Sequence, residues 1–161
     1  MITRKKGQVW SLDFVTSVLI FLIVLIPLFF VWNHVNAENQ QQRAFEDIEG
    51  MTLSLSDSII RTKGYPEGWN NLSVTIIGLA SEENVLNSTK VNYFLTMGNS
   101  NYNITRAILT GSYDFFFELR DINGTLIGTI GSKSGDRMVV PIERYCLLNE
   151  RIVKMELALM A

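Results

Sequence analysis

The sequence contains one cysteine, Cys146, and one histidine, His34, among 161 residues. A single cysteine excludes a disulfide framework within the chain. Cys146 has apolar neighbours in a predicted strand, which favours a buried and inert thiol. His34 lies two residues beyond a long apolar run, where a solvated imidazole is far commoner than a metal ligand. We therefore expect no metal site.

Charged residues are also scarce, at 19% of the chain against roughly 25% in soluble domains. A net charge of −2 is too small, and the hydrophobic share too large, for a disordered chain. The slight negative charge argues against a nucleic-acid partner, because its field repels phosphate. The glycines lack the strand–turn–helix setting of a phosphate loop. Paired carboxylates such as Glu82 and Glu83 fit a solvated surface, so neither an enzyme nor a cofactor is predicted.

One long apolar run dominates what is present. Residues 14–32, FVTSVLIFLIVLIPLFFVW, contain no charge. As a helix, they span roughly 28 Å, about the hydrocarbon thickness of a membrane. A simple soluble protein is thereby excluded. The residues from 63 to 161 are numerous enough for a head with a modest hydrophobic core.

Basic residues precede the apolar run. Arg4, Lys5 and Lys6 lie within residues 1–7, which contain no acid. By the positive-inside tendency, the N-terminus stays cytoplasmic and the head lies outside. Four Asn-x-Ser/Thr sequons in the head agree with that side and are candidate N-glycosylation sites: Asn71, Asn87, Asn103 and Asn123.

Three interpretations of the N-terminal region are open. The run is an uncleaved signal anchor, or it belongs to a secretory signal peptide cut after Ala37. In the third interpretation, a basic leader is removed at Gly7 and the run stays on the mature protein as a stem. The third accounts for Asp13, a carboxylate at the mouth of the run that gives a secretory signal no advantage. The run also exceeds the about 7–15 apolar residues of a normal signal peptide.

Residues 6–14, KGQVWSLDF, resemble the class III signal peptide of archaeal type IV pilin-like proteins. That pattern has a basic leader, a glycine before the cleavage site, a glutamine after it, then a serine and an acid that open the apolar helix. The resemblance implies cleavage by a prepilin-type peptidase between Gly7 and Gln8. Cleavage before Val9 would instead give the acid its usual fifth place. Residues 64–70, GYPEGWN, and 77–79, IGL, are similar to heads of archaeal pilin-like proteins.

The resemblance implies a structural subunit of an extracellular, type IV pilus-like filament. Its segments would be a leader peptide at 1–7, an apolar transmembrane and assembly helix at 8–35, an extracellular continuation of the helix at 36–62, and a β-rich head at 63–161. The implied partners are a prepilin-type peptidase, other copies of the chain or related pilins, and membrane lipid before assembly.

The precursor would lie in the membrane with its head outside, and the mature protein would form a cell-surface filament. The exposed heads would make adhesive or partner contacts. Two alternatives stay open, namely a monomeric cell-surface binding module on a membrane anchor and a minor pseudopilin.

Two residues of the apolar helix have predicted roles. A carboxylate at the membrane edge is costly unless paired, and the N-terminal ammonium of a neighbouring processed stem would pair with Asp13 during assembly. The alternative is that Asp13 merely caps the helix. Pro27 removes one backbone hydrogen bond and crowds the carbonyl of Ile23, so a helix bend is expected there.

The helix is predicted to continue from about Trp10 to Thr62, weakened near Gly50. Its polar middle is followed by a stripe with the alternating three- and four-residue spacing of a/d positions: Phe45, Ile48, Thr52, Leu55 and Ile59. Gly64 and Pro66 supply stop signals. We expect the stripe to pack on the head of the same chain, with contact between stems as the alternative.

The head is predicted to combine short helices with strands, which makes the whole chain α+β with a long N-terminal helix. Strands are expected at 73–79, 114–122, 125–130, 139–148 and 152–160, with one helix opening at Asn87 and another at 103–109. Asn123-Gly124 and Asn149-Glu150 predict hairpin turns. Pro141 places its strand at a sheet edge or a bulge.

Overall fold

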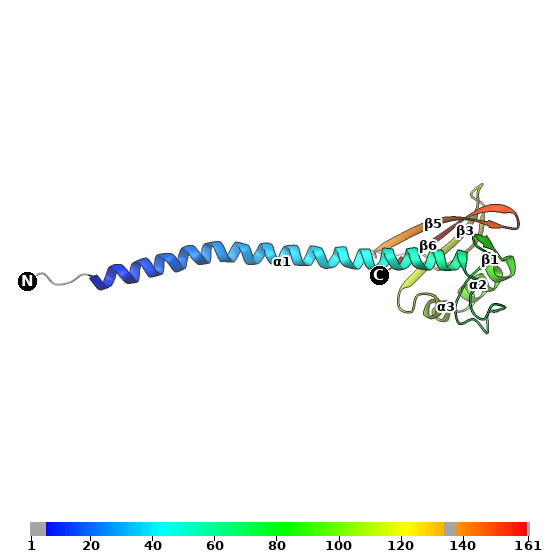
Figure 1. The fold of residues 1–161 in the computed structure, drawn as a ribbon, viewed down its shortest axis with the longest axis horizontal. Helices are drawn as coiled ribbons and strands as arrows, with labels where there is room; N and C mark the ends of the chain where they lie inside the picture. Colours follow the sequence, from blue (N-terminus) through cyan, green and yellow to red (C-terminus); the bar gives the residue numbers. More distant parts are fainter. Residues whose placement is uncertain (1–5, 134–137, 161) are drawn as a thin grey trace, which may run out of the picture. The chain divides into compact units, whose positions relative to one another are not determined.

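The computed structural model describes residues 6–133 and 138–160 (Figure 1). It confirms an α+β fold with a long N-terminal helix and a β-rich C-terminal part. The elements are α1 (Lys6–Arg61), β1 (Ala80–Glu82), β2 (Val85–Leu86), α2 (Ser88–Ser100), α3 (Tyr102–Leu109), β3 (Asp114–Asp121), β4 (Leu126–Ile130), β5 (Val139–Leu148) and β6 (Arg151–Met160).

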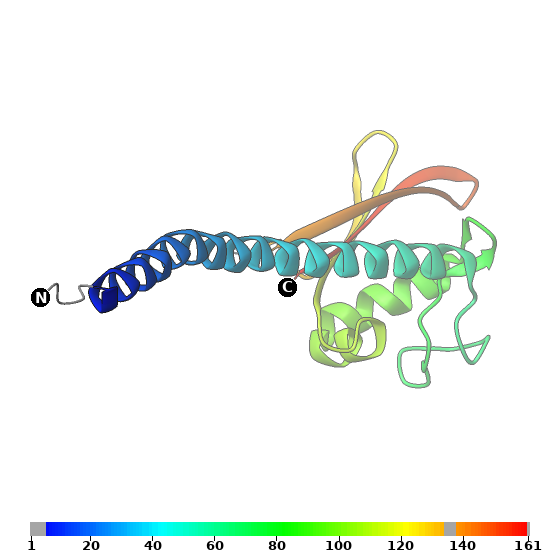
Figure 2. The same ribbon diagram turned by 60° about the vertical axis from the view of Figure 1, so that its left-hand side comes forward.

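The chain divides into two compact units, Met1–Ala44 and Phe45–Ala161. The first unit consists of the N-terminal part of α1, which stays helical through Pro27 and is drawn as a gently curved ribbon in Figure 2. Helical hydrogen bonding also continues through Gly50, so the weakening expected there does not interrupt α1. The second unit, called the head below, includes residues 45–61 of α1.

The predicted stripe packs within the head, as expected. Ile48 and Ile59 join the hydrophobic core, Thr52 is buried with its hydroxyl donating to the Ile48 carbonyl, and Leu55 packs partly against the core. Phe45 departs from the expectation because it is 41% exposed. It lies one turn before Ile48, at the start of the packed segment.

The end of α1 is held by backbone and side-chain donors from distant residues. The N–H groups of Leu79, Asn84 and Ala80 donate to the carbonyls of Ile59, Ile60 and Thr62, respectively, at 2.8 to 3.0 Å. The next carbonyl, that of Lys63, accepts from Trp69 Nε1 at 3.1 Å and from Lys90 Nζ at 2.6 Å. Two of the terminal carbonyls that the helix leaves unpaired, and the two carbonyls just beyond its end, are thus satisfied by tertiary contacts.

The strand predicted at 73–79 is wrong. Only Ile76 forms a bridge, with Tyr65, and the rest of the segment belongs to no strand. The apolar composition reflects burial of Ile77 and Leu79 beside the end of α1. Because the N–H of Leu79 is used by a helix carbonyl, it is unavailable to a sheet ladder.

The sheet has six strands in the order β1-β2-β5-β6-β3-β4. The pairs are antiparallel except that β2 runs parallel to β5 at Leu147 and Leu148. The central strands β3 and β6 carry much of the core in alternate positions: Phe115, Phe117, Leu119, Val153, Met155, Leu157 and Leu159. Alternation of this kind gives the sheet one face for packing and one for solvent.

Both predicted helices of the head are present. Asn87 caps α2, with its Oδ1 accepting from the N–H groups of Thr89 and Lys90. Val91 and Phe94 are buried, and the Phe94 ring meets Phe117 edge-on with centroids 5.0 Å apart. Asn101 then ends α2 and caps α3.

The two predicted hairpins form, but their turns differ from the simplest expectation. In the turn between β3 and β4 only Gly124 has positive φ (85°), while Asn123 does not. A β-turn from Asp121 to Gly124, followed by a left-handed glycine, has the form of a three-residue hairpin loop. Asn149 and Glu150, at φ 51° and 64°, instead form the two-residue turn with both positions left-handed.

β5, which contains Pro141, is not the edge strand that was predicted, because it lies between β2 and β6 in the sheet, but its stretch around Pro141 has no described neighbour on the side away from β6. The N–H of Leu147 points away from β6, because it donates to the carbonyl of Asn84. Residues of the same parity along β5 face the same edge. Since β2 pairs with β5 only at Leu147 and Leu148, the missing N–H of Pro141 costs no hydrogen bond in the described ladder.

We predict opposite effects of alanine at two glycines of the head. A Cβ at Gly78 would collide with the Gly64 nitrogen and the Thr62 carbonyl, which are backbone atoms, so Gly78→Ala should destabilise by about 1–3 kcal/mol. Gly50 lies inside α1 with open space around its Cα, so Gly50→Ala should stabilise by about 0.5–1 kcal/mol. Denaturant titration of the full chain, followed through exposure of the buried Cys146 thiol, measures both. Equal midpoints for the two variants would contradict this account of the Gly64–Gly78 contact.

Candidate functional site

The first candidate site is the apolar segment of α1. Leu12–Val35 forms 24 residues of helix, long and apolar enough to cross a membrane, with none of it buried within the structure. A signal sequence has the same character. The Thr16 hydroxyl donates to the Leu12 carbonyl at 2.8 Å, so this polar group is satisfied within the helix. Residues 14–32 of the segment carry no charged side chain and are exposed, so the surface of the helix there is predominantly apolar.

Asp13 lies at the N-terminal end of this segment and is exposed. Because α1 begins at Lys6, Asp13 is about two turns inside the helix and does not cap it here. Among the described residues it has no hydrogen-bond or ion-pair partner. Gly7 and Gln8, the residues of the predicted cleavage site, lie in the first turn of the same helix.

The four sequons occupy separate places in the head. Asn71 lies in the exposed loop after α1, Asn103 is exposed on α3, and Asn123 is exposed in the turn between β3 and β4. Asn87 differs, because it is half-buried and its Oδ1 is engaged as the cap of α2. The acceptor asparagines of three of the four sequons are thus exposed to solvent.

Ion pairs organise the outer face of the sheet. Glu143, Glu156 and Glu118 occupy matching positions on β5, β6 and β3, a row of like charges that would repel. Each carboxylate has a cation, namely Lys154 for Glu143 at 2.9 Å, Lys133 for Glu156, and Arg120 for Glu118. The hydrogen bond from Arg120 lowers the pKa of the Glu118 carboxyl, and the bond to Glu143 raises the pKa of Lys154.

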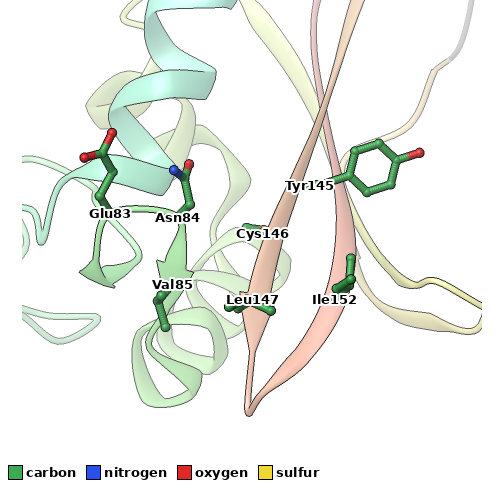
Figure 3. Close-up of a pocket in the computed structure, with 7 residues that line it drawn as sticks. All are labelled: Glu83, Asn84, Val85, Tyr145, Cys146, Leu147 and Ile152. Carbon is green, nitrogen blue, oxygen red and sulfur yellow. The ribbon is translucent and has the colours of Figure 1, made fainter.

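A small cavity at the edge of the head contains Cys146. Its volume is about 220 Å³, and it is lined by Glu83, Asn84, Val85, Tyr145, Cys146, Leu147 and Ile152 (Figure 3). In Figure 3, Glu83 and Asn84 lie on one side of β5 and the Tyr145 ring on the other. The polar groups do not converge on a common point, and Glu83 is paired with Arg61 at 3.4 Å.

Cys146 itself is a poor nucleophile. The side chain is buried, and burial raises the pKa of the thiol to about 12. Across the residues that the structure describes, no group of three or more His, Cys, Asp or Glu side chains is placed to hold a metal ion. The cavity therefore offers an apolar recess and no reacting centre.

The structure adds a feature that the sequence analysis missed. Exposed apolar side chains gather where the two hairpins turn, including Ile122, Tyr145 and Ile152. The sequence signal was weak, because the three residues lie in separate segments and each directly follows a charged residue. Their proximity arises from strand pairing across β5, β6 and β3.

Comparisons with family models, with curated proteins and with solved structures give no match for this chain.

We predict that Cys146 stays unmodified in the folded protein. A membrane-permeant maleimide at pH 7 should label native protein at least about a hundredfold more slowly than denatured protein, because the thiol is buried and un-ionised. Stability should also fall as pH rises above about 8.5, where the unfolded thiol ionises and the folded thiol does not, up to about 12. The Cys146→Ala variant should lack this part of the alkaline loss. Rapid native labelling at pH 7 would contradict the burial.

Proposed function

We propose that this chain is a structural subunit of an archaeal type IV pilus-like filament that assembles through its apolar N-terminal helix. The observation that carries the proposal is the Leu12–Val35 segment, an apolar helix with no part buried within the chain. Outside a membrane such a surface is costly, at about 25 cal/mol for each Å² of apolar area. Packing against the same segment of neighbouring subunits offsets that cost once the protein leaves the lipid.

The continuity of α1 supports retention of the segment on the mature protein. The helix passes through Ala37, the position of the alternative secretory cut, and its last turns carry core residues of the head. A cut after Ala37 would discard the apolar segment, whereas a cut at Gly7 would keep it. A contact that repeats from subunit to subunit without closing produces a helical filament.

In the proposed assembly, Asp13 would fix the axial offset between the apolar helices of neighbouring subunits. Its carboxylate has no described partner within the chain, yet it lies at the edge of an apolar helix. An unpaired carboxylate in hydrocarbon is costly. In the proposed assembly it meets the new N-terminal ammonium of a neighbour, and misaligned neighbours leave both charges unpaired.

Processing is predicted to depend on Gly7. Gly7→Leu should leave a precursor that keeps Arg4, Lys5 and Lys6, because a bulky side chain blocks the backbone's access to a peptidase at the membrane. Gly7→Ala is the matched small-residue control and should be processed at least in part. Intact-mass measurement distinguishes the forms, since cleavage removes the mass of residues 1–7. The same cleavage removes three cations and no acid, so the side-chain net charge falls from −2 to −5.

A mature protein that begins at Gln8 or Val9 supports the proposal. One that keeps Met1 instead supports a permanently anchored surface module, and one that begins at Glu38 supports a secretory signal peptide. Normal processing of Gly7→Leu would contradict the predicted cleavage site.

Asp13 is predicted to matter for assembly and not for folding of the head. Asp13→Asn keeps the size of the side chain and removes its charge, so the protein should reach the membrane and be processed while filaments become sparse or absent. Asp13→Glu keeps the charge and should retain part of the assembly. Negative-stain microscopy of cells measures filament number and length. Filaments of normal number and length from Asp13→Asn would refute the pairing role.

A further inference from the structure

The outer end of the sheet carries an apolar surface, the tip surface, formed by Ile122, Tyr145 and Ile152. Their exposed fractions are 64%, 64% and 48%. Ile122 follows β3, Tyr145 lies on β5 and Ile152 is the second residue of β6, so three separate segments contribute. Exposed apolar side chains that gather in this way usually meet something other than water.

Two cavities extend along the tip surface. One, of about 310 Å³, is lined by Asp121, Ile122, Asn123, Arg151 and Ile152. The other, of about 210 Å³, is lined by Arg120, Asp121, Ile122, Gly124, Tyr145 and Lys154. Ile122 and Asp121 line both. Apolar floors with charged hydrogen-bonding groups at the rim are typical of ligand sites.

Asn123 forms part of the wall of the first cavity and is the acceptor residue of the Asn-Gly-Thr sequon. Its Nδ2 donates to Asp121 Oδ2 at 3.2 Å. A side-chain amide nitrogen has two protons, so this bond uses one and leaves the other free for substitution. Substitution of the second proton is compatible with the same amide–carboxylate contact.

We propose that Asn123 carries an N-linked glycan that lies in the two cavities and covers the tip surface. The apolar faces of the sugar rings would pack on Ile122, Ile152 and the Tyr145 ring. The hydroxyl groups would meet the rim charges, such as Arg151 and Lys154. The glycan converts an apolar surface of the head into a hydrated one and protects it from adventitious contact.

Attachment of the glycan requires one co-reactant, an oligosaccharide linked to a lipid phosphate. The bond between the sugar C1 and the phosphate oxygen breaks, and a bond forms between C1 and Asn123 Nδ2. One amide proton leaves, and the lipid phosphate is the leaving group. No oxidant or reductant is involved.

The other sequons have no comparable setting. Asn87 is half-buried as the cap of α2. Asn71 and Asn103 are exposed but do not line any cavity described in this structure. Asn123 alone among the four joins a described cavity to exposed apolar side chains.

The glycan proposal rests on the outward placement of the head in the proposed function. The experiment distinguishes failure of the glycan proposal from failure of the filament proposal. The full chain, in its native cells, carries Ile152→Cys together with either Thr125→Ala, which destroys the sequon, or Thr125→Ser, which keeps it. Both changes leave the Asn123 side chain and the Thr125 carbonyl, which accepts from the Asp121 N–H, in place. Native Cys146 is buried and contributes no background.

Glycopeptide mass spectrometry should find a glycan at Asn123 in the Thr125→Ser protein and none in the Thr125→Ala protein. A membrane-impermeant, polymer-linked maleimide applied to intact cells should label Ile152→Cys about fivefold more slowly in the Thr125→Ser background, because the glycan is bulky. Ile76→Cys, at a site that is 55% exposed in the loop between α1 and β1 and lies outside all four sequons, is the control and should react equally in both backgrounds.

A bare Asn123 on a head whose Ile76→Cys is labelled from outside would overturn this proposal and leave the filament proposal standing. Equal labelling of Ile152→Cys in the two backgrounds, with the glycan present, would also overturn it. Absence of Ile76→Cys labelling on intact cells would refute the outward head, and both proposals with it.

Discussion

The head depends on how the C-terminal end of α1 satisfies its carbonyl groups. A helix that ends inside a fold leaves its last carbonyls without partners, and each one left buried and unpaired costs about 1–3 kcal/mol. Here the carbonyls of Ile59, Ile60 and Thr62 accept from the segment 79–84. The same contacts place β1 and β2 beside the helix, and β2 then joins the sheet by pairing with β5 at Leu147 and Leu148.

The loop after the helix follows from the same requirement. Gly64 takes a positive φ of 74°, which turns the chain back, and Gly78 approaches it so closely that neither position has room for a side chain. The Trp69 indole is buried and donates to the carbonyls of Lys63 and Gly78, joining the two sides of the loop. The lysine at position 90, at the start of α2, adds a third donor. Its pKa is lowered because burial disfavours the ammonium form, so this contact is made at an electrostatic cost.

The apolar segment of α1 and the outer face of the sheet are suited to different solvents. Residues 14–32 are exposed and carry no charged side chain, whereas the outer face of the sheet balances its carboxylates with cations that lie within hydrogen-bond reach. The proposed function uses both properties, since the helix would exchange lipid for neighbouring helices and the sheet would face water. The tip surface is the exception on the sheet, and a covalently attached sugar would reconcile it with water.

Features set by neighbours in sequence were predictable from the sequence alone. The apolar run, the motif around Gly7, the a/d stripe, the Asn87 cap and both hairpins depend on local composition and spacing, and the helices and hairpins appear close to the expected residues. The cleavage site and the role of Asp13 were likewise predicted from the motif at residues 6–14. Tertiary structure decided the rest. It used the N–H groups around residue 79 for helix carbonyls, left Phe45 exposed at the start of the packed segment, and brought Ile122, Tyr145 and Ile152 together from three strand ends. These outcomes depend on partners dozens of residues away, and no local pattern encodes which donor reaches which acceptor.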